Sequence, residues 1–258
     1  MKLKDQTAIV TGGGRGIGRT IALTLAREGA NVLVCGRHRE GLESTAQEIE
    51  QLARRSSVVV ADVSQEPQVT AVVESALQSF GRIDILINNA GVAGPTARVT
   101  NVTRKEWDEV LAVNLTSAFL CAKAVIPHMI QQQSGRIVNI SSIAGKRAYA
   151  LRSPYAASKW GMIGLSATLA QELGPHNIQV NAICPGPTAG ERMHAVIAGR
   201  ARELGQSETE VERLYVEGTA LKRMVDPEHV AAMVLLLVSH EGSSITGEAI
   251  DVSAGYGL

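Results

Sequence analysis

The sequence predicts an α/β fold in which helices cover both faces of a doubly wound parallel sheet of about seven strands. Short apolar runs alternate with helical patterns along the whole chain, and the runs are continuously apolar, as parallel strands covered on both faces are. A glycine-rich turn follows the first run and opens the first helix. No linker or repeat divides the 258 residues, so we expect one Rossmann-like domain over residues 1–258.

The candidate elements alternate regularly. Seven apolar runs have the length of strands: Ala8–Val10, Val32–Cys35, Val58–Ala61, Ile83–Asn88, Ile137–Ile140, Gln179–Ile183 and Ala249–Val252. Helical patterns separate them: Ile17–Glu28, Glu40–Ala53, Pro67–Ser79, Thr116–Gln132, Tyr155–Leu173 and Pro227–Val238. Start signals support helices at three places: capping boxes from Thr103 to Glu106 and from Ser207 to Glu210, and an N-cap at Asp226 before Pro227.

One segment, at about 187–225, interrupts this alternation. It has about 40 residues, which is long for an α/β connection, and it contains helical patterns of its own. Because it follows the sixth strand, it would overhang the carboxyl ends of the strands, where open α/β sheets bind ligands. We expect it to be a substrate-loop insertion.

Composition excludes several classes of partner. Twenty-five basic residues balance 25 acidic ones, so there is no electrostatic footprint for nucleic acid. No apolar run approaches the roughly 18–20 residues of a membrane span, and the chain opens without a signal-peptide pattern. Cys35, Cys121 and Cys184 lack metal-ligand spacing and indicate buried, reduced thiols. We therefore expect a cytoplasmic protein with no metal, nucleic-acid or membrane partner.

The glycine-rich turn predicts a nucleotide site. Its glycines follow the spacing Gly12-x-x-x-Gly16-x-Gly18. Glycines permit a tight turn and a close approach of the backbone to a pyrophosphate, which a helix N-terminus attracts. A structural hinge is the alternative for a glycine-rich turn alone, but the setting between strand and helix favours a dinucleotide.

The end of the second strand indicates which dinucleotide. NAD-binding versions place an acidic residue here to hold the ribose 2′-hydroxyl, whereas this chain has Gly36 and then Arg37. Together with Arg15 from the glycine turn, Arg37 suits a 2′-phosphate, which predicts NADP(H). The alternative is that both arginines are solvated surface residues. Asp62, after the third strand, is either a partner for the adenine amine or a helix-entry cap with Ser64.

Tyr155 and Lys159 are the most informative pair in the chain. They stand four residues apart in a helical pattern after Pro154, so they share one helix face. A free tyrosine hydroxyl has a pKa near about 10, and an ammonium within about 4–6 Å favours its phenolate. The pair therefore predicts a tuned acid/base, although this spacing also occurs by chance in many surface helices.

Together these motifs resemble the short-chain dehydrogenase/reductase family in its single-domain form. The resemblance covers essentially the whole chain. The matching motifs appear in order as Thr11-Gly12 with Gly16-Ile17-Gly18, Asp62-Val63, Asn88-Asn89-Ala90-Gly91, Asn114, Ser141-Ser142, Tyr155 with Lys159, Pro185-Gly186 and Ile245-Thr246-Gly247.

The resemblance implies roles for matching positions. Tyr155 would be the acid/base, Lys159 would tune it and bond the nicotinamide ribose, and Ser142 would hold the substrate oxygen. Asn114 would continue a proton relay through water. With the two arginines, the predicted cofactor site comprises Gly12, Arg15, Gly16, Ile17, Gly18, Arg37, Asp62, Val63, Asn89, Ala90, Gly91, Tyr155, Lys159, Pro185, Gly186 and Thr188.

Two positions depart from the family pattern. Gly190 stands where members often carry a threonine that contacts the nicotinamide carboxamide, which leaves Thr188 as the nearby candidate. The tail reads Val252-Ser-Ala-Gly255, where Val-Asp-Gly-Gly is usual. That segment often packs between subunits, so the departure bears on assembly.

The predicted function is NADP-dependent hydride transfer between the nicotinamide and a secondary alcohol or ketone, as in an alcohol dehydrogenase or carbonyl reductase. A 3-oxoacyl-thioester reductase of fatty-acid type uses the same motifs and is the alternative. A non-catalytic nucleotide-binding sensor is a remote third. The predicted substrate contacts are Ser142, Ala144, Tyr149, Arg152 and Met193.

Two further expectations concern charge and assembly. Arg152, just before the catalytic helix, could grip an acidic substrate group at the pocket mouth, or it could simply face water or pair with an acid such as Glu191. The Tyr155–Leu173 helix mixes small and apolar residues all round and shows no clear polar face. In the family the equivalent helices pack between subunits, so we expect a homotetramer or homodimer.

Overall fold

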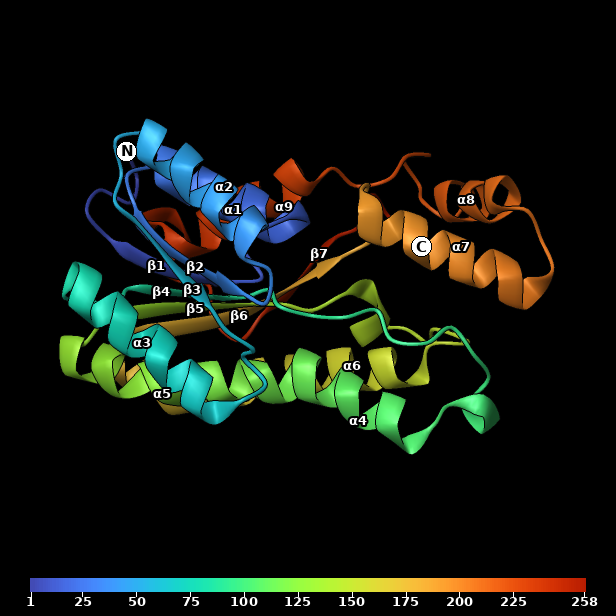
Figure 1. The fold of residues 1–258 in the computed structure, drawn as a ribbon, viewed down its shortest axis with the longest axis horizontal. Helices are drawn as coiled ribbons and strands as arrows, with labels where there is room; N and C mark the ends of the chain where they lie inside the picture. The colour runs from blue at the N-terminus through green and yellow to red at the C-terminus, as the bar shows by residue number, and fades with distance from the viewer.

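The computed structural model describes residues 1–258 and contains one wholly parallel sheet in the order β3-β2-β1-β4-β5-β6-β7 (Figure 1). The strand order reverses beside β1, between β1 and β4. Such a switch point is where open α/β sheets bind ligands. The strands are β1 Thr7–Thr11, β2 Asn31–Gly36, β3 Ser56–Val60, β4 Ile85–Asn88, β5 Gly135–Ile140, β6 Ile178–Pro185 and β7 Ala249–Val252.

All seven predicted strands are present; β7 has the predicted bounds, and the other six have shifted ends. The fourth begins at Ile85, and not at Ile83 as expected. Ile83 is buried, but its amide bonds no neighbouring strand: it donates to the Gln132 side chain, which in turn donates to the Ile83 carbonyl. The sixth strand extends to Pro185, which pairs with Val252.

Helices cover both faces of the sheet (Figure 1). On one face lie α1 and α9 with α2 beside them, and on the other lie α3, α5 and α6. Each layer encloses its own apolar core, of 24 and 21 buried residues respectively. The bounds are α1 Gly16–Arg27, α2 Arg39–Gln51, α3 Glu66–Phe80, α5 Ser117–Gln132, α6 Ser153–Leu173 and α9 Pro227–Val238.

The helix predicted at Thr116–Gln132 forms as α5, Ser117–Gln132, but it continues a longer helical run. A capping box at Thr103 and Glu106 forms as predicted and opens α4, Arg104–Leu111. A π-helical turn, Ala112–Thr116, then joins α4 to α5 without a break. The joined run, Arg104–Gln132, is apolar and long enough to cross a membrane by length and composition alone. Its α5 part packs against the sheet, as a core helix does.

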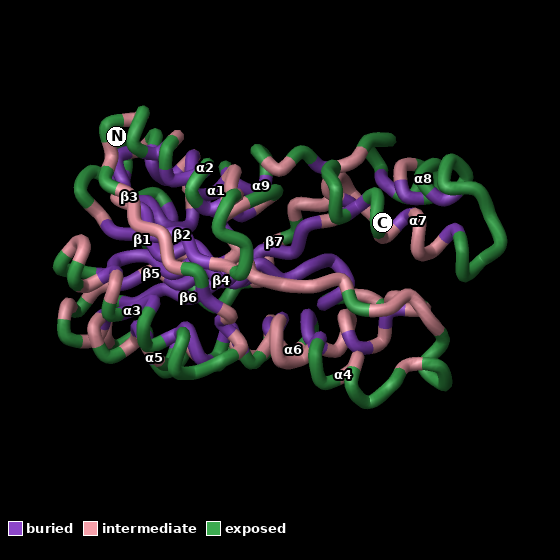
Figure 2. The backbone as a smooth tube through the Cα atoms, viewed as in Figure 1, coloured by how far each residue is buried: buried purple, intermediate pink, exposed green.

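The insertion contains two helices, α7 Glu191–Leu204 and α8 Glu208–Glu217. They project past the carboxyl ends of the strands, and their backbone is more exposed than the sheet (Figures 1 and 2). The second capping box, at Ser207 and Glu210, forms as predicted. Asp226 occupies the N-cap of α9, but its carboxylate makes no capping bond and lies 3.7 Å from His229 instead.

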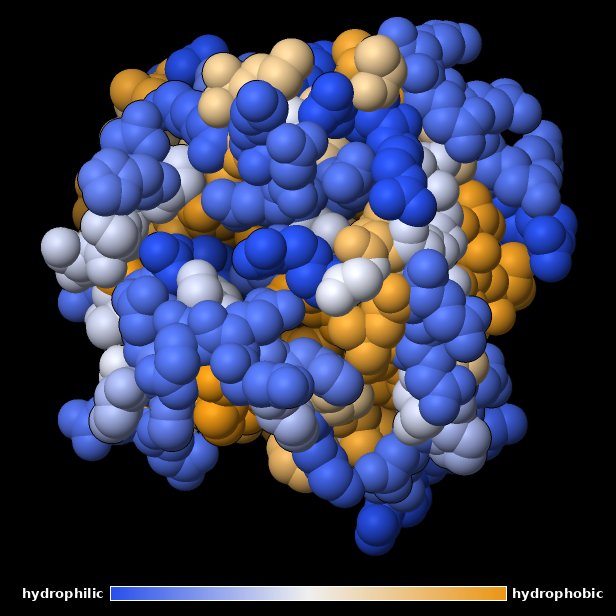
Figure 3. Space-filling model, turned by 90° about the vertical axis from the view of Figure 1, so that its left-hand side faces the viewer, coloured by the Kyte–Doolittle hydropathy of each residue, from blue (hydrophilic) through white to orange (hydrophobic).

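The opposite end of the sheet, where the strands begin, faces the viewer in Figure 3. Its surface is largely hydrophilic. Charged side chains, including Arg82, Asp84 and Arg136, gather around the strand starts. None of the predicted site residues lines this pocket, so the predicted site lies at the other end of the sheet.

Candidate active site

The glycine turn leaves the N-terminus of α1 open to an anion. Gly12 and Gly16 have φ angles of 65° and 52°, which favour glycine. The N-cap residue Arg15 makes no side-chain capping bond, and no acidic residue stands in the first turn. A Cβ at Gly18 would collide with the Gly12 carbonyl and the Asn89 amide. The free N–H groups and the close packing fit a pyrophosphate.

Thr11 joins the glycine turn to the segment after β4. Its hydroxyl accepts hydrogen bonds from the backbone amides of Asn89 and Ala90, at 3.0 and 2.9 Å. The Asn89 side chain donates back to the carbonyls of Thr11 and Gly12. The predicted cofactor segments after β1 and β4 therefore form one bonded unit at the switch point of the sheet.

The side chains after β2 and β3 share one electrostatic environment. Burial would raise the pKa of Asp62, but hydrogen bonds from the Ser64 hydroxyl and amide, together with the charge of Arg37, lower it below its ordinary value. Arg37 is exposed, and Arg15 is 77% exposed with only a 3.9 Å contact to Glu191. Neither guanidinium therefore forms a close ion pair that would compete with a phosphate.

The carboxyl end of β6 forms a tight turn against the C-terminal tail. A Cβ on Gly186 would lie 2.8 Å from the Cα of Ser253, so only glycine allows this approach. Thr188 donates its hydroxyl to the Gly186 carbonyl at 3.0 Å and pairs through its backbone with Val225. Gly190 follows with a φ of 133°.

Helix α6 holds Tyr155 and Lys159 one turn apart, as the spacing predicted. The Lys159 ammonium lies 5.8 Å from the centre of the Tyr155 ring and donates to the Ile140 carbonyl at 2.7 Å. Burial, with a further contribution from the charge of Arg192, lowers the pKa of Lys159 to about 7. Tyr155 is half-buried, so its ring is shielded from water in part and remains partly accessible.

Two adjacent serines follow β5, and their contacts distinguish them. Ser141 donates its hydroxyl to the Lys159 carbonyl at 2.9 Å, which anchors α6 to the sheet. Ser142 only accepts, from the Ala144 amide at 3.1 Å. The O–H of Ser142 thus remains able to donate to a substrate oxygen. The structure gives a physical reason for preferring Ser142 that the sequence spacing lacked.

Asn114 is fully buried in the π-helical turn. Its side-chain oxygen accepts from the Val92 amide at 2.7 Å, and its amide donates to the Val92 carbonyl and to the Ser158 hydroxyl, each at 3.1 Å. Single π-helical turns inside α-helices are frequent at functional sites. Here the turn fixes the loop after β4 to α6. A proton relay through Asn114 stays a prediction.

The predicted substrate residues divide into two groups. Ala144 is buried beside Ser142, whereas Met193 belongs to a small apolar cluster of α7 and α8. Tyr149 bonds the Tyr215 hydroxyl at 2.7 Å, which connects the loop before α6 to α8.

Arg152 is not an open side chain at the pocket mouth. It is only 3% exposed, and it donates to the Ala93 carbonyl at 2.7 Å and to the Thr96 hydroxyl at 3.4 Å. This burial corrects the placement expected from the sequence. Its reason is that the loop after β4 folds back onto the loop before α6, a long-range contact with no local signal.

Sequence reasoning missed one contact over the site. Arg192, from α7, donates to the Gly91 carbonyl at 2.6 Å and so joins the insertion to the loop after β4. Nothing in the local sequence marks this bond, because the partner is a backbone carbonyl far along the chain.

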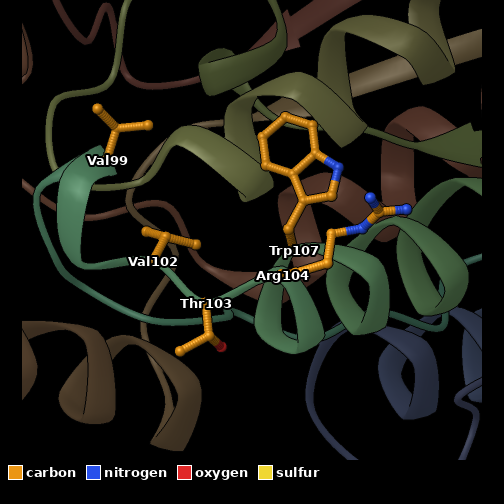
Figure 4. A pocket seen from close by; sticks show the side chains of 5 residues that line it. All are labelled: Val99, Val102, Thr103, Arg104 and Trp107. Atoms are coloured by element: carbon orange, nitrogen blue, oxygen red, sulfur yellow. The ribbon is translucent and has the colours of Figure 1, made fainter.

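An open cavity of about 490 Å³ lies at the start of α4 (Figure 4). Its lining contains none of the predicted site residues, so it supports no catalytic role. The lining residues are Val99, Val102, Thr103, Arg104 and Trp107. The three cysteines are free and buried, and no group of residues has the geometry of a metal site.

Comparisons with known proteins agree with this geometry. A family model described as "short chain dehydrogenase" matches residues 6–201. A 3-oxoacyl-[acyl-carrier-protein] reductase FabG of Thermotoga maritima is 37% identical, with 99% of each chain covered. Among solved structures, an NAD⁺-bound xylitol dehydrogenase has a TM-score of 0.96 at 32% identity, covering 99% of this chain and 100% of that one. A variant actinorhodin polyketide ketoreductase with NADPH has a TM-score of 0.94 at 33% identity, covering 98% and 97%.

Proposed function

Since the chain belongs to the short-chain dehydrogenase/reductase family, we propose that it transfers a hydride between NADP(H) and a ketone or secondary alcohol, with Tyr155 as acid/base. One observation carries the proposal. Tyr155 and Lys159 share a helix face, Ser141 bonds the Lys159 carbonyl, and the hydroxyl of the adjacent Ser142 has a proton left to donate. A site with these donors suits a carbonyl oxygen that gains charge during reduction.

The chain's residues supply orientation and a proton. When bound, the nicotinamide supplies or accepts the hydride. Ser142 donates to the substrate oxygen, and Tyr155 protonates it in reduction or takes its proton in oxidation. Lys159 donates a hydrogen bond to the Ile140 carbonyl, which ties α6 to the end of β5. Ser141 bonds the Lys159 carbonyl and so anchors α6, the helix that carries Tyr155 and Lys159.

The proposed cofactor preference is NADP(H). The residues fit a dinucleotide because the start of α1 is uncapped and glycines line its approach. Arg37 and Arg15 are exposed and available to a 2′-phosphate, and no carboxylate follows β2 directly to hold a 2′-hydroxyl. Asp62 follows the next strand, β3, and its lowered pKa keeps it ionised as an acceptor for the adenine amine.

Reduction of a 3-oxoacyl thioester is the second candidate, because relatives 34–38% identical bear the name 3-oxoacyl-[acyl-carrier-protein] reductase. The same Tyr155 chemistry serves both reactions. The sensor alternative lacks support, since Asn114, Ser142, Tyr155 and Lys159 are all present and lie at one end of the sheet.

One substrate screen distinguishes these candidate functions. The protein is assayed with NADPH and with NADH against simple ketones, cyclic ketones and acetoacetyl-coenzyme A. Carbonyl reductase activity predicts turnover of free ketones, whereas a thioester reductase predicts a kcat/KM for acetoacetyl-coenzyme A at least about tenfold higher. NADPH binding without turnover of any carbonyl would support the sensor and contradict the proposal.

A further inference from the structure

Arg152 is a buried cation without a counter-ion. The residue is only 3% exposed, yet it takes part in no ion pair. Its polar contacts are the Ala93 carbonyl at 2.7 Å and the Thr96 hydroxyl at 3.4 Å, and its Nε has no partner. Burying an unpaired charge is costly, so the position of this cation calls for a physical explanation.

The guanidinium lies against two tyrosine rings. Its central carbon is 5.1 Å from the centre of the Tyr155 ring and 6.0 Å from that of Tyr149. The Lys159 ammonium is 5.8 Å from the same Tyr155 ring. Tyr155 therefore has two cationic neighbours, one from its own helix and one from the residue before that helix. A cation against an aromatic ring interacts favourably, and more so away from water.

We propose that Arg152 is a positioning residue for the acid/base: its guanidinium holds the loop at residues 93–96 against the Tyr155 ring and favours the phenolate form of Tyr155. The proposal rests on the function proposed above. It adds a second, permanent cation to the pair that the family resemblance implies. In alcohol oxidation the phenolate accepts the hydroxyl proton, and in reduction the phenol returns it.

The other charged groups around Tyr155 do not supply this effect in the same way. Lys159 has a pKa lowered to about 7, so its charge varies near neutral pH. Arg192 is exposed and bound to the Gly91 carbonyl. Lys146 is neutralised by Asp251 at 2.7 Å. The loop over residues 91–97 carries no charged side chain.

The test compares three variants. Arg152→Met removes the charge and keeps much of the volume, and Arg152→Lys keeps the charge but cannot span both loop contacts. Arg200→Met is the matched control, because the Arg200 guanidinium lies 5.8 Å from the ring of Tyr215, a tyrosine outside the proton-transfer pair. Each is measured for alcohol oxidation across pH, for KM with acidic and neutral ketones, and for melting temperature.

In Arg152→Met, the pH of half-maximal alcohol oxidation should rise by about 0.5–1.5 units, which lowers the rate at neutral pH about 3–30-fold. Arg152→Lys should fall between Arg152→Met and the unmodified protein, and Arg200→Met should leave the profile unchanged. An unchanged pH profile in Arg152→Met with only a lower melting temperature would overturn the proposal in favour of a structural role. A KM increase confined to acidic ketones, without a pH shift, would also overturn it and assign Arg152 to the substrate.

A second readout does not depend on turnover. The four tyrosines are titrated by phenolate absorbance, with and without Arg152→Met, each in the presence and absence of Tyr155→Phe. Subtracting the titration of each Tyr155→Phe protein from that of its matching parent leaves the titration of Tyr155, because the contributions of the other three tyrosines cancel. An upward shift of the Tyr155 titration in Arg152→Met supports the proposal even if no carbonyl substrate is found. No shift contradicts it even if the protein proves to be a reductase.

Discussion

At the scale of single residues, the separation of Ser141 from Ser142 is the most instructive detail. Both are small hydroxyl side chains after a buried strand, and the sequence distinguished them only by family spacing. Their hydrogen bonds give the physical difference: one hydroxyl is committed to the Lys159 carbonyl, and the other keeps its proton. The burial of Arg152, by contrast, could not be predicted from its neighbours in the sequence, because it arises from a loop about 60 residues earlier in the chain.

Arg37 should decide the cofactor preference. Arg37→Asp replaces an exposed guanidinium with a carboxylate, which repels a 2′-phosphate and can accept from a 2′-hydroxyl. Because one charge-assisted hydrogen bond contributes about 1.5–3 kcal/mol, the preference for NADPH over NADH should fall more than tenfold and reverse. The ratio of kcat/KM for the two cofactors measures this. Arg104→Asp, on the distant α4, should leave the ratio unchanged, and equal use of both cofactors by the unmodified protein would contradict the assignment.

Lys159 should make stability depend on pH. Its folded pKa of about 7 lies below the unfolded value of about 10.4, so between these values the unfolded state binds one more proton. The free energy of unfolding therefore rises with pH across this window. Below about pH 7 the folded protein carries the cost of a buried charge, which Lys159→Met removes.

The melting temperature of Lys159→Met should thus exceed that of the unmodified protein most at pH 6, and the gap should narrow toward pH 10. Lys123→Met, at an exposed lysine paired with Glu66, is the control and should show no such trend. A gap that widens as pH rises would mean that Lys159 stays charged when buried.

At the scale of elements, the strands were predictable because each is a continuous apolar run between turn signals. The capping boxes at Thr103 and Ser207 were also local and formed as expected. What could not be predicted was the joining of α4 to α5 through a π-helical turn, and the exact helices of the insertion. Both depend on packing against distant segments: Asn114 bonds Val92, and Arg192 bonds Gly91.

Gly18 should be irreplaceable at the start of α1. Its added methyl would meet the Gly12 carbonyl, which is backbone and cannot rotate away. Gly18→Ala should lose about 1–3 kcal/mol of stability and weaken NADPH binding, as measured by denaturation and by nucleotide fluorescence. Gly174→Ala, just past the end of α6, is the control: an added methyl meets nothing there and the φ is −51°, so the change should be neutral or stabilising by up to about 1 kcal/mol. If the two substitutions changed stability and NADPH binding equally, the close packing at Gly18 would have no special role in the cofactor site.

At the scale of the whole molecule, two apolar layers hold a sheet whose carboxyl end carries the predicted site residues and whose insertion extends beyond it (Figures 1 and 2). The balanced charge and the single domain were evident from the sequence. We propose a cytoplasmic setting, in which the three buried thiols would stay reduced. Assembly stays a prediction, because it depends on a surface that a single chain leaves uncovered.

The exposed apolar side chains on α5 and α6 should lie between subunits. Phe119 is 47% exposed and Trp160 is 52% exposed, large values for such rings. Light scattering at micromolar concentration should give a dimer or tetramer. Trp160→Glu should reduce the assembly, whereas Leu221→Glu, at a residue 61% exposed in the insertion, should not. A monomeric unmodified protein would contradict the predicted assembly.

The central claim is that Tyr155 transfers the proton in an NADPH-dependent carbonyl reduction. Its most direct test is single-turnover oxidation of bound NADPH by a ketone, followed by NADPH absorbance, in the unmodified protein and in Tyr155→Phe. The substitution removes one hydroxyl and leaves the ring, so NADPH affinity should change little while the rate falls at least about 100-fold. A near-normal rate in Tyr155→Phe, with NADPH still bound, would contradict the account.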